Sequence, residues 1–185
     1  MKSAKPFCFG SSLLLAVAFC GALAGCGEDK APAQSTVAVA EPKPISTYFP
    51  IKLGGQTVQL QIAATTSEMQ TGLMRRTDLG PDQGMVFIYA RPERMRFWMQ
   101  NTPLPLDIGY FTSDGVLREV YPMYPYDETA ISSKNPQIQF SVEMNQGWYQ
   151  KHGVAPGARL ELKAIAEALK ARGFDPKAYG MTTEN

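Results

Sequence analysis

Alternating apolar and polar residues recur from residue 48 onward, which is the pattern of strands that bury one face. The alternation predicts strands over 48–53, 58–62, 106–112, 116–121 and 137–144. Further strands are predicted over 84–90, 94–101 and 159–163. Gly54-Gly55 and Ser113-Asp114-Gly115 separate two pairs of these segments, so two hairpins are expected.

Helical spacing is confined to short segments. A first helix is predicted after residue 65 by a capping box, formed either by Thr65 with Glu68 or by Ser67 with Gln70. It would carry apolar residues four positions apart on one face, which favours packing against the sheet.

Two more helices are predicted near the C-terminus. Asn145 can cap a short helix that runs through about His152, and a closing helix over 164–172 ends before Gly173. Short strands with two or three short helices predict an α+β fold. We expect a mostly antiparallel sheet that is curled or barrel-like, because curling protects exposed strand edges.

The first 26 residues have the pattern of an export signal. Lys2 and Lys5 precede an apolar run over 13–19, which is shorter than the about 20 residues that a bilayer requires. The run leads to Leu23-Ala24-Gly25-Cys26, which resembles the lipobox of bacterial lipoproteins. The resemblance implies that Cys26 is acylated and becomes the mature N-terminus. An ordinary secretory signal or an uncut membrane anchor are the alternatives.

Cysteine usage and charge agree with export. Cys8 and Cys20 lie in the segment that would be removed, so the mature chain would keep only Cys26 and could form no internal disulfide. Removing 1–25 deletes two of 18 basic residues and none of 17 acidic ones, which leaves 16 − 17 = −1. A nearly neutral chain gives no electrostatic case for binding nucleic acid.

The residues after Cys26 predict a flexible tether and the membrane in which the protein is anchored. Ala, Pro, Ser and charged residues dominate 27–46, which is linker composition. In Gram-negative bacteria an Asp at this position commonly marks inner-membrane retention, so Gly27 favours the outer membrane, with the protein on the periplasmic side of the envelope. The predicted organisation is a signal peptide over 1–25, a lipidated cysteine and tether over 26–46, a domain over 47–173 and a tail over 174–185.

Several phrases of the domain occur in a characteristic order. They are GLMRR at 72–76, GMVF at 84–87, FWMQNT at 97–102, PLDI at 105–108, DG at 114–115, PY at 125–126, VEMNQG at 142–147, HGV at 152–154 and PG at 156–157. Together they resemble the uncharacterised DUF192 family over roughly 47–163. Gln100 stands where Lys is usual, and Arg75 where an aromatic is common, which leaves Arg76 as the family arginine. The family has no established activity, so the resemblance implies no reaction.

The segment from Phe97 to Asp107 is the best candidate for a binding site. Two prolines stiffen a stretch that carries Trp98, Asn101 and Asp107, which would present hydrogen-bonding groups beside an indole ring. The alternative is that Trp98 belongs to the core, while Asn101 and Asp107 hold their own loop through backbone hydrogen bonds.

Other polar residues could join this site. Arg76 could pair with Asp107 or with an anionic ligand, and Glu143 could join Asp107 as a carboxylate pair for acid–base chemistry. Tyr121, Tyr124 and Tyr126 could stack on sugars or pack on the sheet edge.

Familiar catalytic and metal motifs are absent from the sequence. His152 is the only histidine, and there is no calcium-loop spacing, no phosphate-binding glycine loop and no nucleophile elbow. We therefore expect no cofactor and no metal. The sequence favours a membrane-tethered envelope module that binds a small polar ligand, a glycan or a protein. The alternatives are an envelope hydrolase that uses Asp107 and Glu143, and a scaffold for envelope assembly.

Overall fold

The computed structural model describes residues 41–181 of the chain. The predicted signal peptide, Cys26, Gly27 and the tether before residue 41 lie outside the described residues. Within residues 41–181, no helix is both long and apolar enough to cross a membrane.

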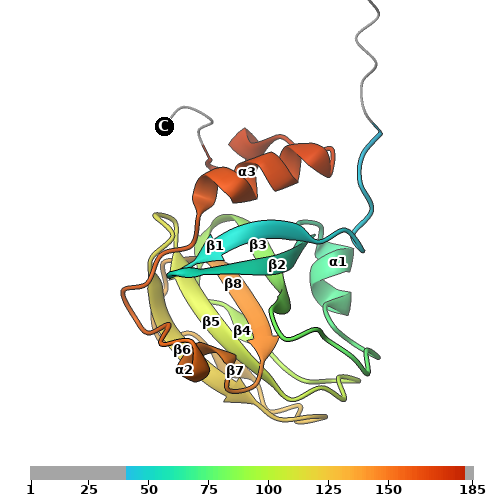
Figure 1. The fold of residues 1–185 in the computed structure, drawn as a ribbon, viewed down its shortest axis with the longest axis vertical. Coiled ribbons are helices and arrows are strands. Elements are labelled where there is room, and N and C mark those ends of the chain that lie inside the picture. The colour runs from blue at the N-terminus through green and yellow to red at the C-terminus, as the bar shows by residue number, and fades with distance from the viewer. Residues whose placement is uncertain (1–40, 182–185) are drawn as a thin grey trace, which may run out of the picture. The chain divides into compact units, whose positions relative to one another are not determined.

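A six-stranded sheet forms the centre of the domain (Figure 1). Its strands lie in the order β1 (Phe49–Leu53), β2 (Gln56–Ala63), β3 (Gln83–Glu93), β8 (Ile138–Asn145), β5 (Leu106–Thr112) and β6 (Leu117–Met123). The β2–β3 pair is parallel and the other four pairs are antiparallel. The predicted α+β class with a mostly antiparallel sheet is confirmed, and so are the hairpins β1–β2 and β5–β6.

The sheet is curled but open. Isolated bridges join Leu160 to Leu53 at the end of β1, and Arg159 to Val116 just before β6. The two edge strands, β1 and β6, therefore each contact the segment 157–161 only at one end of the strand. The predicted strand over 159–163 is wrong, because the chain enters a helix at Leu162 after these two bridges.

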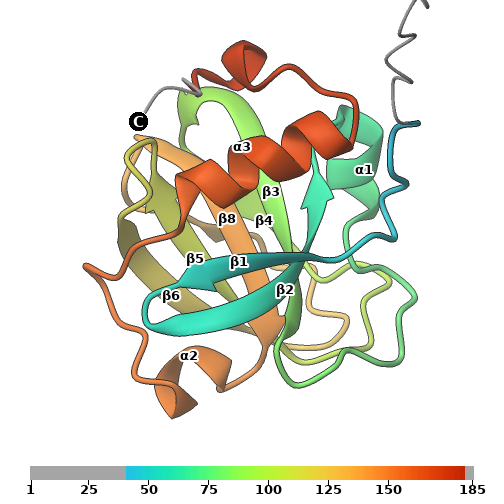
Figure 2. The ribbon, with the colours of Figure 1, turned by 45° about the horizontal axis from the view of Figure 1, so that its top comes forward.

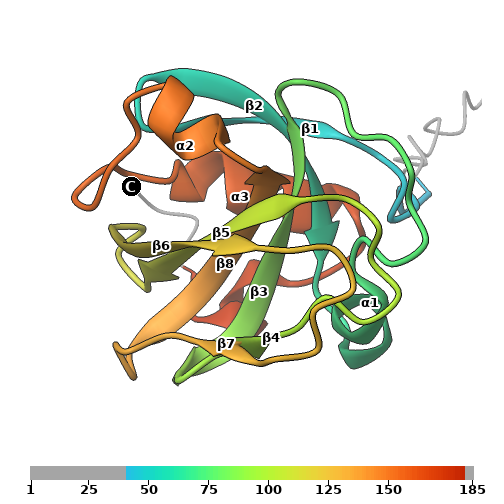
Figure 3. The same ribbon diagram turned by 90° about the horizontal axis from the view of Figure 1, so that it is seen from below.

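A second, smaller sheet pairs β4 (Arg96–Phe97) with β7 (Ile131–Ser132), and Figure 3 shows the two strands side by side. The strand predicted over 94–101 is therefore reduced to two residues. After Phe97 the chain turns, since Thr102 N–H donates to the Met99 carbonyl over 3.1 Å and Asn101 takes a left-handed φ of 53°.

Two of the predicted helices occur where the pattern placed them. α1 (Thr66–Thr71) has the predicted capping box between Thr65 and Glu68. α3 (Leu162–Ala171) buries Ile165 and Leu169 and lies across the sheet (Figure 2).

The remaining helical turns differ from the prediction. α2 (Trp148–Lys151) begins after Gly147 at a left-handed φ of 82°, so the prediction of Asn145 as its cap is wrong. The Asn145 amide instead donates to the carbonyls of Leu79 and Gly80. Residues predicted to be tail form a 3₁₀ turn, η1 (Pro176–Tyr179), which packs against β3.

The core has two parts because strand side chains alternate between faces. On one face, residues such as Phe140 and Val142 pack beneath α3. On the other face, Phe87 and Tyr110 pack with Met95 and Met99 from the segment around β4. This second face carries the candidate site.

Candidate functional site

The register of β5 and β8 separates the two carboxylates that were predicted to act as a pair. Asp107 lies opposite Met144, whereas Glu143 lies opposite Ile108. Because consecutive residues of a strand point to opposite faces, the side chains of Asp107 and Glu143 emerge on opposite faces of the sheet. The prediction of a carboxylate pair is therefore wrong, and these two residues cannot work together on one bond.

Asp107 has a structural role. Its Oδ2 accepts a hydrogen bond of 2.8 Å from the Gly147 N–H and so holds the turn that starts α2. Burial raises the pKa of this carboxyl, while the hydrogen bond from Gly147 acts in the opposite direction. Asp107 thus fastens β5 to the turn after β8.

Arg76 also makes structural contacts. Its Nη1 donates to Gln61 Oε1 over 2.8 Å and to the Tyr48 hydroxyl over 3.2 Å. Among residues 41–181 the ion pairs are Arg172–Glu68, Lys170–Glu167 and a longer His152–Asp82 contact, so the predicted Arg76–Asp107 pair is not formed. Arg76 ties the loop after α1 to β2 and to the residue that precedes β1.

Asn101 contributes its backbone to a junction of loops. Its carbonyl accepts from Arg75 N–H over 2.7 Å, and the next carbonyl, that of Thr102, accepts from Tyr126 N–H over 3.1 Å. Arg75, Asn101 and Tyr126 all have positive φ, a conformation that Asn tolerates better than most residues. The backbone geometry accounts for Asn at this position.

Trp98 and Glu143 are the two predicted residues that share a cavity. The Trp98 side chain is 49% exposed, so the alternative that placed it in the core is wrong. Both residues line a pocket of about 550 Å³ on the face of the sheet opposite α3. Arg76, Asn101 and Asp107 are not among its lining residues.

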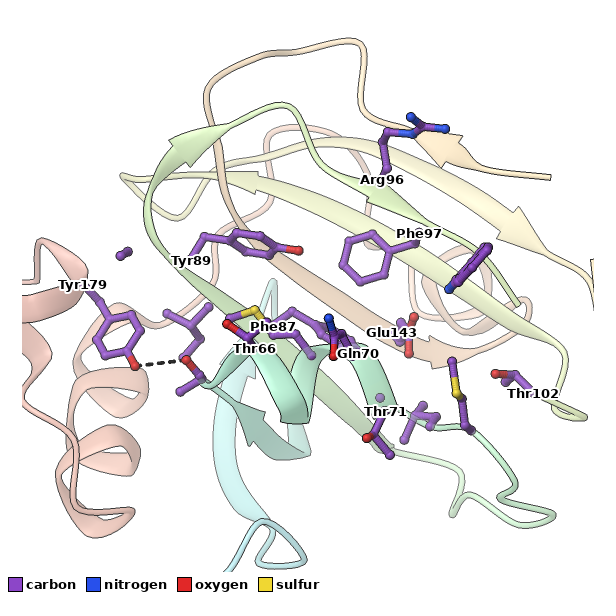
Figure 4. Close-up of a pocket in the computed structure, with 18 of the residues that line it drawn as sticks. Thr66, Gln70, Thr71, Phe87, Tyr89, Arg96, Phe97, Thr102, Glu143 and Tyr179 are labelled. Atoms are coloured by element: carbon purple, nitrogen blue, oxygen red, sulfur yellow. Dashed lines mark hydrogen bonds between the residues drawn. The ribbon is translucent and has the colours of Figure 1, made fainter. Parts of the chain in front are cut away.

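The pocket lies between α1, β3, the β4 segment and η1 (Figure 4). Its aromatic lining comes from Phe87, Tyr89, Phe97, Trp98 and Tyr179. Phe87 and Phe97 meet edge to face with ring centroids 4.9 Å apart. Polar groups at the lining come from Thr66, Gln70, Thr71, Arg96, Thr102 and Glu143.

Glu143 is the buried polar residue of this pocket. It lies between Met85 on β3 and Ile108 on β5 and is 5% exposed. Within residues 41–181 no hydrogen bond contributes to the pKa shift of its carboxyl group, and neither carboxyl oxygen is among the fully enclosed unpaired polar atoms, so the group opens onto the pocket. Desolvation raises the pKa of Glu143 to about 8, so the group is mostly protonated at neutral pH.

The C-terminal segment supplies one wall of the pocket. Tyr179 lines it, donates from its hydroxyl to the Ala64 carbonyl over 3.1 Å, and accepts at its own carbonyl from Gln139 Nε2 over 2.6 Å. Arg172 forms an ion pair with Glu68, the residue that also caps α1. No local pattern predicts this wall, since two of its contacts, Tyr179 with Ala64 and Arg172 with Glu68, join residues more than 100 positions apart.

The tyrosines predicted to contact sugars lie outside the pocket lining. Tyr124 and Tyr126 are exposed, whereas the half-buried Tyr121 donates to Glu119 over 2.6 Å. Among residues 41–181 there is also no group of three or more His, Cys, Asp or Glu side chains placed to hold a metal ion.

Comparison with known proteins defines the family. The model of DUF192, described as an uncharacterised ACR, matches residues 49–162. The chain therefore belongs to the DUF192 family. The match ends at the first residue of α3, so most of α3 and all of η1 lie beyond it.

Two solved structures resemble the domain. One is a protein of Sinorhizobium meliloti 1021 provisionally described as a transcription regulator, with 34% identity, a TM-score of 0.59 and coverage of 62% of this chain and 95% of that one. The other is a protein of unknown function from Novosphingobium aromaticivorans DSM 12444, with 32% identity, a TM-score of 0.61 and coverage of 67% of this chain and 94% of that one. No curated protein matches the chain.

Proposed function

We propose that this protein is a lipid-anchored module of the bacterial envelope that binds a small molecule in the pocket around Glu143. The observation that carries the proposal is a cavity of about 550 Å³ with aromatic walls and one buried carboxyl group, that of Glu143, whose pKa shift has no hydrogen-bond contribution. Ligand pockets are typically apolar cavities of roughly 300–1,000 Å³ with a few polar groups that orient the ligand.

A small molecule fits this pocket better than a glycan or a protein does. The polar group that would give specificity, Glu143, is only 5% exposed and lies on a central strand. A flat protein surface or a polymer would not reach it. The exposed Tyr124 and Tyr126 lie outside the pocket and are not needed for this function.

The anchor is proposed from the sequence of the first 46 residues. The lipobox-like Leu23-Ala24-Gly25-Cys26 would supply an acylated N-terminus, and Gly27 favours the outer membrane if the cell is Gram-negative. A flexible linker of about 20 residues has a mean reach of roughly 25 Å. Such a tether would hold the domain near the bilayer while leaving the pocket free to meet soluble ligands.

Filling the pocket mouth tests this function. Ala178 lines the pocket and is exposed, so Ala178→Trp should obstruct the cavity at little cost in folding, and Ala155→Trp places the same bulk on an exposed site outside it. The mature, acylated protein is kept in detergent and its melting temperature is measured with a small-molecule extract of the envelope. We expect stabilisation of the parent chain and of Ala155→Trp, and none of Ala178→Trp. Equal stabilisation of all three proteins, or of none, contradicts the proposal.

A further inference from the structure

We propose that the ligand carries an ammonium group, which the Glu143 carboxylate binds at the base of the pocket while the aromatic walls hold the apolar body of the ligand. This inference deepens the proposed function and rests on it. It assigns a chemical class to the ligand, and it makes Glu143 the residue that determines specificity.

The position of Glu143 argues for a charged partner that comes from outside the described chain. The residue lies near the end of the central strand β8, between Met85 of β3 and Ile108 of β5, and its side chain lines the cavity. A buried carboxylate without a partner is costly, and the cost is removed when an opposite charge pairs with it. An entering ammonium group would supply both the charge and the hydrogen-bond donors.

The aromatic walls of the pocket also favour a positively charged ligand. Phe87, Phe97, Tyr89 and Trp98 line it, and the faces of aromatic rings attract cations. Figure 4 shows Glu143 on the same side of the sheet as Phe87 and Phe97. The one basic residue of the lining is Arg96, which is exposed and therefore screened by water. Once Glu143 is ionised, its buried carboxylate therefore dominates the field felt by a ligand deep in the pocket.

Binding of an ammonium group would be coupled to the loss of one proton. The charged and titratable groups around Glu143 are Tyr89 on β3, Tyr110 on β5, Tyr149 on α2 and Arg96 on β4. The pKa values of the three tyrosines are all raised above the usual value near 10, so these groups stay neutral, and arginine stays charged. Ionisation of Glu143 is therefore the step that sets the pH dependence.

Three probes with the same ring and different headgroups test the inference. They are 4-phenylbutylamine, 4-phenylbutan-1-ol and 4-phenylbutyrate, titrated by calorimetry into the mature full-length protein in detergent. At pH 8.5 we expect the amine to bind at least about tenfold more tightly than the alcohol, and the acid to bind most weakly. With a pKa of about 8 for Glu143, the affinity for the amine should fall about 25-fold between pH 8.5 and pH 6.5.

Two variants separate recognition by Glu143 from a general effect of charge. Glu143→Gln keeps the shape of the side chain and should lower the affinity for the amine at least about tenfold while leaving that for the alcohol unchanged. Glu128→Gln removes an exposed carboxylate outside the pocket and should change neither affinity. Melting curves confirm that both variants fold.

The inference is overturned if the alcohol or the acid binds as well as the amine, if Glu143→Gln leaves the affinity for the amine unchanged, or if none of the probes binds. The proposed function is judged by a separate experiment. If the envelope extract stabilises the parent chain but not Ala178→Trp, the pocket binds a ligand of another class.

Discussion

Glu143 is the residue on which both the stability and the proposed chemistry of the domain depend. The residue lines the pocket and is only 5% exposed, and desolvation raises the pKa of its carboxyl group from 4.5 to about 8. The folded chain therefore binds a proton that the unfolded chain releases between these pH values. Stability from this group is fully present below pH 4.5 and is lost as the pH rises through about 8.

Replacing Glu143 by Gln should remove this dependence on pH. Glutamine carries no charge, so the free energy of unfolding of Glu143→Gln should exceed that of the parent chain by an amount that grows by about 1.4 kcal/mol per pH unit as the pH rises toward 8. Urea unfolding of both proteins between pH 5 and pH 9 measures the difference. A difference that stays constant over this range would mean that Glu143 is solvated or paired in the folded protein.

Trp98 shows why single residues of the site were difficult to place from sequence. A strand over 94–101 would put Trp98 on the face opposite Phe97. The chain leaves the strand after Phe97, because Met99 N–H donates to the Asp127 carbonyl over 2.8 Å instead of to a neighbouring strand. Trp98 and Phe97 therefore line the same pocket. The hydrogen bond to Asp127 joins distant segments, and alternation within one segment cannot predict it.

At the scale of elements, the sequence pattern predicts the hairpins and the helix whose contacts lie within one short segment of the chain. The hairpins β1–β2 and β5–β6 have glycine-containing turns between alternating strands, and α1 has its capping box within four residues. The parallel pairing of β2 with β3 has no such local signal, since a strand alternates in the same way whichever direction its neighbour runs. The connection between these two parallel strands carries α1, which lines the pocket.

The ion pair between Arg172 and Glu68 attaches the end of α3 to α1. Arg172 is 7% exposed, so Arg172→Ala would leave Glu68 without its buried partner and should lower the free energy of unfolding by about 3 kcal/mol. Lys170→Ala breaks the exposed Lys170–Glu167 pair of the same helix and should cost less than about 1 kcal/mol. Urea unfolding compares the two variants, and equal losses would mean that the Arg172 pair is as weak as a surface pair.

At the scale of the whole molecule, the export signal predicted for the first residues and the domain described by the structure have different physical tasks. The domain needs no disulfide, because apolar clusters cover both faces of its sheet. The family resemblance correctly indicated the domain, whereas the shape of the pocket could not be predicted, since η1 and α1 meet only in the folded chain.

The proposed anchor depends on a single sulfur atom. Cys26→Ser should prevent acylation, so the variant should move from the detergent-rich phase to the aqueous phase in detergent partitioning, because it loses the acyl chains that hold the protein in the membrane. Cys20→Ser alters a cysteine in the segment predicted to be removed and should leave partitioning unchanged. A mature N-terminal peptide that carries a free Cys26 thiol in mass spectrometry would contradict the anchor.

The protonation state of Glu143 with and without an amine tests the account most directly. The side-chain carboxyl carbons of ¹³C-labelled protein are observed by NMR at pH 7, and the signal missing from Glu143→Gln assigns the residue. We predict a mostly protonated carboxyl in the free protein, consistent with a pKa of about 8, and an ionised carboxylate after 4-phenylbutylamine is added. A carboxyl that is already ionised in the free protein, or one that the amine leaves protonated, would contradict the account.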